Sequence, residues 1–371
     1  MRILQVCPRV PWPPHDGGRV AMLALTRPLR ADVVALNQRK FHVDAAEAAA
    51  ALAPSRLDAV DINTSRIRII RAPLFVARFY SRDFERLLRE RVRGYDVIQL
   101  EGQFLLPYVG AIREETRAPI VLRAQNVESQ IWLRLAAQAS GLRRRALRHV
   151  ARTLREWEAA HLDDCDALVP ISVEDEREFR AMGARRPSLV LPCGIDMSQP
   201  LPRAEVDRYS VYFIGSMRYR PNQEAARWLV DEVWPRVLAL EPRARLTLAG
   251  SGQGEDIADI RTFSAPFRAM LAPMFSGSGM RIKVLEAMAL GKPVVATPLG
   301  AGGIDVTPGE NILIAEDADA MARHVVDVIH DDVLAQRIGD NARALVAERY
   351  DADQLAQCLL DFYKRLWRNA S

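Results

Sequence analysis

The chain has 371 residues, of which 49% are hydrophobic and 26% are charged, so it is long enough for two compact domains that each have their own core. Its net charge of +4 is modest for this length and gives no strong case for nucleic-acid binding. The four cysteines, Cys7, Cys165, Cys193 and Cys358, are widely scattered and form no zinc pattern, so we interpret them as reduced thiols of a cytosolic protein.

No secretory or membrane-spanning segment is expected. The first apolar strand is interrupted by Pro8, Pro11, Pro13 and Pro14 before the core of a signal peptide could form. No other stretch approaches the roughly 20 apolar residues that a membrane-spanning helix requires. We therefore expect a cytoplasmic protein.

Strand-like and helix-like segments alternate along the first half of the chain. Strands are expected at 2–6, 32–36, 67–71, 96–100, 119–123, 166–171 and 188–191, and helices at 18–30, 81–93 and 129–160. This alternation is typical of a parallel sheet that is covered by helices on both faces.

Glycine and polar residues follow several of these strands. Gly17 and Gly18 stand at the start of the first helix, Glu101 follows the strand at 96–100, and Asn126 and Glu128 follow the strand at 119–123. Ligands of parallel α/β sheets collect beyond the carboxyl ends of the strands. These residues are therefore candidates for a binding site.

Seven arginines and no acidic residue occur between positions 134 and 155. The arginines are Arg134, Arg143, Arg144, Arg145, Arg148, Arg152 and Arg155. Apolar residues recur at spacings of three and four, which predicts one amphipathic helix; they are Leu135, Ala139, Leu142, Ala146, Val150 and Leu154. Two interpretations remain open: a helix that lies on an anionic membrane surface, and a solvated basic face of an ordinary packed helix.

The second half repeats the α/β alternation. Strands are expected at 210–215, 244–249, 269–273, 293–297 and 311–314, and helices at 221–240, 280–290, 317–330, 333–348 and 352–368. Prolines mark a break near 192–209. We therefore expect a first domain at 1–192, a linker at 193–209, a second domain at 210–350 and a C-terminal helix at 351–371.

The segment 275–295 carries the strongest chemical signal. Gly277 and Gly279 would let backbone N–H groups approach an anion, and a helix beginning near Met280 would direct its positive dipole end to the same point. Arg281 and Lys283 add cations. Glu286, further along the helix, could accept hydrogen bonds from the hydroxyls of a ribose or a sugar. This pattern fits a nucleoside diphosphate that carries a sugar.

The same segment resembles the donor-binding signature of retaining glycosyltransferases of family 4. The matching residues are Lys283, Glu286-Ala287-Met288-Ala289, Gly291 and Pro293-Val294-Val295. Further segments are similar to the family in the same order: Pro11 to Arg19, Asn126-Val127-Glu128, Pro192 to Asp196, and Pro221 to Ala225. The resemblance implies the GT-B fold, in which two doubly wound Rossmann-like domains face a cleft.

The resemblance also implies roles for individual residues. Catalytic roles fall to Glu101, Gln125, Arg281 and Lys283. Donor binding falls to Gly17, Gly18, Gly215, Arg218, Gly277, Gly279, Met280 and Glu286. The acceptor side falls to His15, Asn126 and Glu128. No metal and no cofactor are expected, because arginine, lysine and a helix end neutralise the leaving diphosphate, and the nucleotide sugar is a substrate.

Three features depart from the family pattern. Gln125 stands where relatives usually have histidine, and Ser278 stands where many have a second glutamate. The segment 251–271 is too short for the strand and helix that relatives place there to contact the base. These departures bear most directly on turnover and on recognition of the base.

We therefore expect a metal-independent retaining hexosyltransferase that uses a nucleotide-diphosphate sugar. Its acceptor would be a glycan or a lipid-linked glycan of cell-surface polysaccharide biosynthesis, and it would be cytoplasmic and peripheral on the inner face of the membrane. The alternative is a non-catalytic nucleotide-sugar-binding protein with a degenerate site, which the departures favour. An isomerase acting on a nucleotide sugar is a third reading, against which the Glu-Ala-Met-Ala segment at 286–289 weighs.

Overall fold

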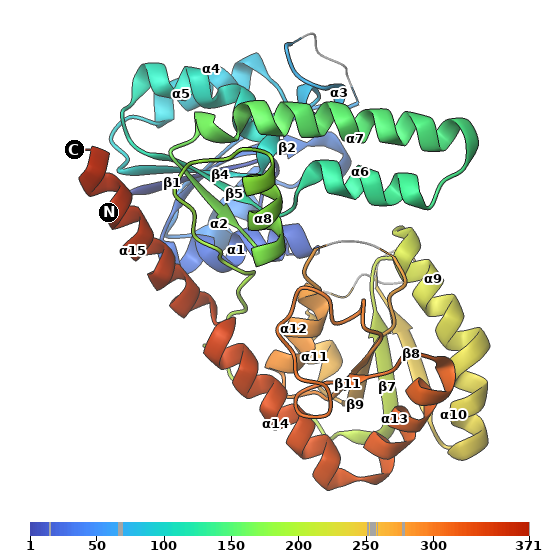
Figure 1. Ribbon diagram of the computed structural model, residues 1–371. Coiled ribbons are helices and arrows are strands. Elements are labelled where there is room, and N and C mark those ends of the chain that lie inside the picture. The colour runs from blue at the N-terminus through green and yellow to red at the C-terminus, as the bar shows by residue number, and fades with distance from the viewer. Residues whose placement is uncertain are drawn as a thin grey trace. The chain divides into compact units, whose positions relative to one another are not determined.

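The structure is a computed structural model that describes residues 1–371 except positions 15, 66–69, 251, 253–256, 258, 277–278 and 371. The chain divides into two units (Figure 1). The first comprises Met1–Gly194 and Ala352–Ser371, and the second comprises Ile195–Asp351. The final helix, expected as a separate segment, is therefore part of the first unit, and the second unit begins inside the expected linker.

The first unit is built on a six-stranded sheet in the order β3-β2-β1-β4-β5-β6, with every neighbouring pair parallel. The strands are β1 (Ile3–Cys7), β2 (Asp32–Gln38), β3 (Leu57–Ile62), β4 (Val97–Glu101), β5 (Ile120–Ala124) and β6 (Ala167–Pro170). The inner strands β1, β4 and β5 are buried along their whole length, because helices cover both faces of the sheet.

One strand of this unit was not predicted, and one predicted strand does not form. β3 lies at Leu57–Ile62, where no strand is predicted, because it is an edge strand whose apolar and acidic residues alternate and are mostly half-exposed. The stretch at 188–191 forms no strand and makes a single bridge, from Ser188 to Leu168. Residues 67–69 of the strand predicted at 67–71 lie outside the described residues.

Helices and short 3-10 turns surround this sheet. The helices are α1 (Gly17–Leu29), α2 (Ala45–Leu52), α3 (Leu74–Ala77), α4 (Arg82–Arg91), α5 (Val109–Glu115), α6 (Glu128–Ala137), α7 (Gly141–His161), α8 (Val173–Ala181) and α15 (Ala352–Ala370). The 3-10 turns are η1 (Arg39–Phe41), η2 (Gln103–Tyr108) and η3 (Leu162–Asp164).

The prediction of a single helix at 129–160 is wrong. A turn separates α6 from α7, and α7 begins at Gly141, whose φ of 55° is in the left-handed region that favours glycine. The two helices pack along each other (Figure 1). The predicted apolar stripe is therefore broken: Leu135 and Leu142 are 43% and 81% exposed, whereas Leu154 is buried in the core.

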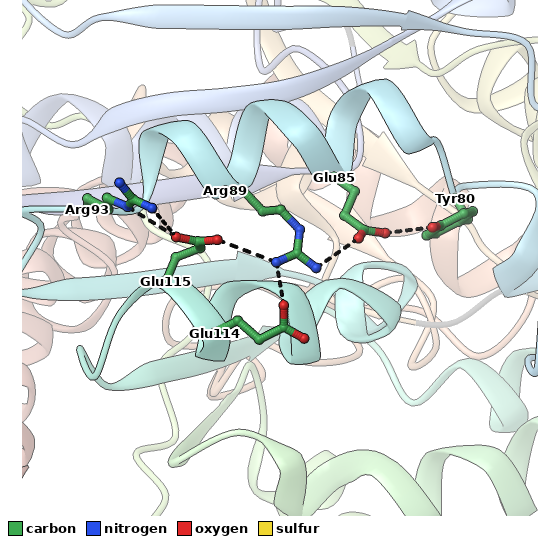
Figure 2. A network of polar contacts seen from close by, with 6 residues as sticks. All are labelled: Tyr80, Glu85, Arg89, Arg93, Glu114 and Glu115. Atoms are coloured by element: carbon green, nitrogen blue, oxygen red, sulfur yellow. Dashed lines mark hydrogen bonds and ion pairs between the residues drawn. The ribbon is translucent and has the colours of Figure 1, made fainter.

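Ion pairs join α4 to α5 on the surface of the first unit (Figure 2). Arg89 of α4 contacts Glu85 of its own helix at 3.2 Å and Glu114 of α5 at 2.5 Å. Arg93 contacts Glu115, and this contact lowers the pKa of Glu115. Exposed pairs of this kind contribute little to stability, so we assign the network to helix packing.

The C-terminal helix α15 belongs to the core of the first unit. It packs along α1, and Leu359 and Phe362 are buried in one cluster with Ile3, Val97 and Val121 of the strands. Because these side chains come from both ends of the chain, the first unit requires its last residues to complete its core.

The second unit contains a five-stranded parallel sheet in the order β11-β10-β9-β7-β8. The strands are β7 (Asp207–Ile214), β8 (Arg245–Ala249), β9 (Phe267–Ala272), β10 (Val294–Ala296) and β11 (Leu313–Ile314). The helices are α9 (Arg220–Trp228), the π-helix η4 (Leu229–Val233), α10 (Trp234–Leu240), α11 (Ile260–Ser264), α12 (Ile282–Ala289), α13 (Ala318–His330) and α14 (Asp332–Arg349). The predicted fold class, two parallel sheets flanked by helices, is confirmed.

Candidate functional site

Two loops of the second unit begin at the carboxyl ends of neighbouring strands. β7 and β9 are adjacent in the sheet, and they end at Ile214 and Ala272. The loop after β7 leads into α9, and the loop after β9 leads into α12. Most of the predicted donor-binding residues therefore gather at one edge of this sheet, where α/β folds bind their ligands.

Gly215, the first residue after β7, lies where no side chain fits. A Cβ atom added there would stand 2.6 Å from Cγ of Asn222, and one added to Gly250 would stand 2.3 Å from the carbonyl oxygen of Gly215. Asn222 also donates a hydrogen bond to the carbonyl oxygen of Ser216 at 3.0 Å. Gly215 thus leaves room for Asn222 of α9, and Gly250 allows the loop after β8 to approach Gly215 closely.

Lys283 lies in the first turn of α12 and contacts the end of β7. Its Nζ donates hydrogen bonds to the carbonyl oxygen of Ile214 at 3.0 Å and to Oδ1 of Asn222 at 3.1 Å, and it lies 4.4 Å from the ring centre of Phe213. Burial lowers the pKa of Lys283 to about 7, and Arg281 adds to this shift. Because an ammonium group has three donors, one remains for a ligand oxygen.

Arg281, Met280 and Gly279 connect the loop after β9 to α12, which begins at Ile282 rather than near Met280. Gly279 has a φ of 78°, and its carbonyl oxygen accepts a hydrogen bond from Nη1 of Arg281 at 3.3 Å. The side chain of Arg281 is buried, and the backbone of Met280 packs against Gly303. Gly277 lies outside the described residues. The N-terminal end of α12, where the helix dipole is positive, suits an anion.

Glu286 lies one turn after Lys283, so the two side chains are neighbours on α12. Burial raises the pKa of Glu286 to about 7, and the charge of Asp259 adds to the shift. Among the described residues, none donates a hydrogen bond to its carboxylate. Glu286 therefore retains acceptor capacity for ligand hydroxyls.

The loop after β7 presents an exposed arginine, and the helix that follows it contacts the loop after β9. Arg218 is exposed, and its side chain lies beside Gly252 of the loop after β8. Glu224 of α9 accepts a hydrogen bond from Oγ of Ser276 at 2.9 Å and contacts Arg220 at 2.7 Å. Glu224 thus ties α9 to the loop that precedes Gly279.

In the first unit, Glu101 ends β4 and is only 1% exposed, so it does not itself face a ligand. Its Oε1 accepts hydrogen bonds from Gln5 at 2.7 Å and Gln99 at 2.5 Å. Its Oε2 accepts hydrogen bonds from Arg123 and Gln125, each at 3.1 Å. The structure therefore gives Glu101 the role of holding Gln125, which is half-buried just beyond β5.

Asn126 and Glu128 follow Gln125 and lead into α6. The carbonyl oxygen of Asn126 accepts a hydrogen bond from Gln103 at 2.6 Å. Glu158 of α7 accepts hydrogen bonds from the backbone N–H of Glu128 at 2.9 Å and of Ser129 at 3.2 Å, so it caps α6 from the neighbouring helix. Burial raises the pKa of Glu128 to about 8, and the carboxylate of Glu158 adds to the shift.

Gly17 and Gly18 begin α1, whereas the other predicted donor-binding residues belong to the second unit. Asp16 caps the helix by accepting from the N–H of Arg19 at 3.1 Å, and Arg9 lies so close that a Cβ on Gly18 would stand 2.3 Å from its Nη2. His15, predicted on the acceptor side, lies outside the described residues.

Sequence reasoning did not select Asn222, Glu224 and Ser276, although Asn222 contacts Lys283, and Glu224 and Ser276 join α9 to the loop after β9. The signal for two of them was present, since Pro221 to Ala225 matches the family pattern. Ser276 precedes the first glycine of the loop and carries no pattern of its own. Contacts between separate loops are visible only in the folded unit.

Metal and membrane features are few in the part of the chain that the structure describes. No group of three or more His, Cys, Asp or Glu side chains there is arranged to hold a metal ion. Among the same residues, no helix combines the length and the hydropathy needed to cross a bilayer.

Comparison with known proteins matches most of the second unit to a family model. The family model described as glycosyl transferases group 1 matches residues 208–331. An uncharacterized 44.6 kDa protein in the cps region of Klebsiella pneumoniae is 26% identical over 215 residues, which cover 51% of this chain and 54% of that protein. A GDP-mannose-dependent monoacylated alpha-(1-6)-phosphatidylinositol monomannoside mannosyltransferase of Corynebacterium glutamicum is 24% identical over 233 residues, which cover 53% of this chain and 61% of that enzyme. The chain thus matches little more than half the length of these relatives.

Solved structures resemble the whole chain. Sucrose-phosphate synthase from Thermosynechococcus elongatus superposes with a TM-score of 0.68 at 16% identity and covers 100% of both chains. HepE from Anabaena, in complex with UDP, superposes with a TM-score of 0.65 at 16% identity, covering 98% of this chain and 100% of its own. The chain therefore has the GT-B fold of glycosyltransferases, and its residues 208–331 match the family model of glycosyl transferases group 1.

Proposed function

We propose that the protein is a retaining glycosyltransferase that moves a hexose from a nucleotide-diphosphate sugar to a glycan or lipid-linked acceptor in cell-surface polysaccharide biosynthesis. The observation that carries the proposal is the arrangement on α12, where Arg281 precedes the first turn and Lys283 and Glu286 share a face. Two cations and a carboxylate are thus spaced for a diphosphate and a diol.

Breaking the bond between sugar and phosphate leaves negative charge on the diphosphate. Arg281, Lys283 and the N-terminal turn of α12 would stabilise this charge without a metal ion. Arg218, which is exposed on the neighbouring loop, would add a further cation. Glu286 would accept hydrogen bonds from the ribose of the nucleotide.

The relatives support the choice of donor and acceptor. HepE structures hold UDP-glucose, and the Corynebacterium enzyme is named for GDP-mannose and a phosphatidylinositol mannoside. The Klebsiella protein lies in a cps region. Retention of configuration follows from the resemblance of 275–295 to family 4, in which the leaving phosphate is thought to help take the acceptor proton.

We further propose that the protein is cytoplasmic and binds the inner membrane surface through the hairpin of α6 and α7. The first turns of α7 expose Arg143, Arg144, Arg145 and Arg148. Leu135 and Leu142 are exposed beside them, near the turn between the helices. Basic and apolar side chains together suit an anionic lipid surface, where a lipid-linked acceptor would be found.

A second candidate is a nucleotide-sugar-binding protein without turnover. Gln125 favours it, because an amide lacks the imidazole that relatives usually carry there, and the short segment at 251–271 favours it too. The two candidates share donor binding and differ in acceptor-dependent release of nucleoside diphosphate.

Donor binding is tested by thermal shift against UDP-, GDP- and ADP-sugars, with calorimetry on each hit. We expect one class of nucleotide sugar to bind wild type and Glu286→Ala to weaken that binding by at least about tenfold, since the ribose loses a charged acceptor. Equal affinities for wild type and Glu286→Ala would remove the ribose assignment. Failure of every donor to bind would contradict both candidates.

A further inference from the structure

A row of buried polar side chains crosses one face of the first sheet. Gln5 is in register with Gln99, and Glu101 is in register with Arg123. Gln99 and Glu101 are two residues apart on β4, so all four side chains point to the same face. Each is at most 1% exposed. Burying these polar and charged side chains costs folding free energy, so their presence here indicates a function.

Two hydroxyl groups complete the hydrogen bonds of the glutamine amides in this row. The hydroxyl of Tyr363, on α15, donates to Oε1 of Gln99, and the hydroxyl of Thr26, on α1, donates to Oε1 of Gln5 at 2.6 Å. Each glutamine therefore directs its Nε2 toward Glu101, whose Oε1 accepts both hydrogen bonds. Because the carboxylate of Glu101 only accepts hydrogen bonds, it determines which end of each amide faces it, and the hydroxyls hold the opposite ends in place.

The second oxygen of Glu101 contacts Gln125 at the edge of the sheet. Its Oε2 accepts from Nε2 of Gln125 at 3.1 Å and from Arg123 at 3.1 Å. Because Nε2 of Gln125 is directed to Glu101, its Oε1 is the end left for a ligand. Gln125 is half-buried just beyond the carboxyl end of β5, where ligands of parallel sheets collect.

We propose that Tyr363 is a positioning residue: through Gln99 and Glu101, it fixes the amide of Gln125 so that Oε1 accepts a hydrogen bond from a hydroxyl of the bound sugar or acceptor. The inference rests on the proposed glycosyl transfer. It gives the C-terminal helix a part in turnover, 264 positions away in sequence from the strand residue that it contacts.

The test is Tyr363→Phe, which removes one oxygen atom and keeps the packing of the ring. We expect kcat to fall about three- to tenfold, the effect of one lost neutral hydrogen bond, with donor affinity unchanged. The double variant Tyr363→Phe/Gln125→Ala should be no slower than Gln125→Ala, because both changes act through one group. Unchanged kcat in Tyr363→Phe, or effects that multiply in the double variant, would overturn the proposal.

The matched control is Tyr108→Phe, which removes another fully buried hydroxyl of the same unit. The Tyr108 hydroxyl accepts from the N–H of Ser81 at 2.7 Å and donates to the carbonyl oxygen of Phe79 at 2.8 Å, and none of these groups belongs to the row. Tyr108→Phe should lower thermal stability at least as much as Tyr363→Phe does and leave kcat unchanged. An equal loss of kcat in both variants would assign the effect to stability.

A spectroscopic readout separates failure of this inference from failure of the proposed function. The side-chain amide of Gln125, observed by 15N NMR, should shift in Tyr363→Phe and stay in place in Tyr108→Phe. An unmoved amide overturns the inference whatever the activity. If the amide shifts while wild type shows no transfer with any donor and acceptor, the positioning stands and glycosyl transfer is wrong.

Discussion

Lys283 would bind a diphosphate as a cation, but its amine is buried and has lost much of its hydration. The pKa of about 7 means that the amine is increasingly neutral above this pH in the free protein. The bound diphosphate favours the ammonium form, so binding above pH 7 takes up a proton. We expect donor affinity, measured by calorimetry, to fall by up to about tenfold per pH unit above 7.

The variant Lys283→Met isolates this effect. Its donor affinity should be lower than that of wild type at pH 6 and should not fall as the pH rises to 9, since ionisation of Glu286 in this range favours ribose binding. Lys292→Met is the matched control, because burial also lowers the pKa of Lys292, to about 8, while its Nζ donates to Ala265 and Phe267 away from the site. A Lys283→Met protein that keeps the alkaline fall would show that another group causes it.

At Gln125, the missing histidine can be restored. An imidazole there would reach the Glu101 oxygen that now accepts from Gln125 Nε2, and the carboxylate would stabilise its protonated form. We expect Gln125→His to raise kcat several-fold without tightening donor binding. An unchanged or lower kcat, with the fold intact by circular dichroism, would mean that the amide is the better group for this enzyme.

The residue scale also shows what a single sequence reveals of a site. The spacing of Arg281, Lys283 and Glu286 is local, so their shared position on a helix could be predicted. The position of Glu101 at a strand end was predicted too, but its burial was not. Its partners come from other strands and from α15, and one sequence does not tell which distant residues meet.

At the scale of the elements, two carboxyl groups meet at the start of α6: that of Glu128 and that of Glu158 from α7. The pKa values of both are raised, chiefly by burial. The pKa of Glu128 rises from the 4.5 of an ordinary glutamate to about 8. The folded state therefore binds more protons than the unfolded state between these values, and the free energy of unfolding falls as pH rises through this window.

Glu128→Gln should remove this fall in the free energy of unfolding. We expect its melting temperature to match that of wild type near pH 5, to exceed it increasingly up to about pH 8 and to keep a constant excess above that, because an amide does not ionise. Glu115→Gln is the control: the pKa of Glu115 is lowered, so its protonation lies below this range and its difference from wild type should stay constant from pH 5 to 9. A constant difference in Glu128→Gln would contradict the assigned shift.

The hairpin of α6 and α7 is tested as an element by reversing three exposed arginines together, Arg143, Arg144 and Arg145, to glutamate. Each basic residue near an anionic bilayer contributes about 1 kcal/mol, so binding to phosphatidylglycerol vesicles should fall by well over tenfold. Thermal stability should be unchanged, because these side chains are exposed.

An equal change in net charge elsewhere is the control. Arg27, Arg39 and Arg117 are also exposed in the first unit, and their reversal to glutamate should have a smaller effect on vesicle binding. If both triple variants lose binding equally, vesicle binding depends on overall charge and not on the hairpin. If neither does, the basic turns of α7 are a solvated face.

Two errors at this scale have physical causes. Residues on both sides of the turn before Gly141 favour a helix, so periodicity continued across it, although Ser140 and Gly141 are turn residues. β3 pairs only at one edge, and most of its side chains are half-buried and two are acidic, so it lacks the apolar run by which buried strands are recognised.

For the whole molecule, alternation of strands and helices was enough to predict two parallel sheets. It did not predict that the last helix joins the first unit, because a helix carries no mark of the core against which it packs. The segment between β8 and β9 holds only the short helix α11 among its described residues, and the second sheet has five strands against six in the first.

The central claim is glycosyl transfer, and the most direct measurement is release of nucleoside diphosphate from the donor that binds, with and without a cell-envelope lipid extract. We predict release that depends on the extract and is lost in Lys283→Met. Donor binding with no release across all acceptor fractions would contradict the claim and favour the non-catalytic candidate.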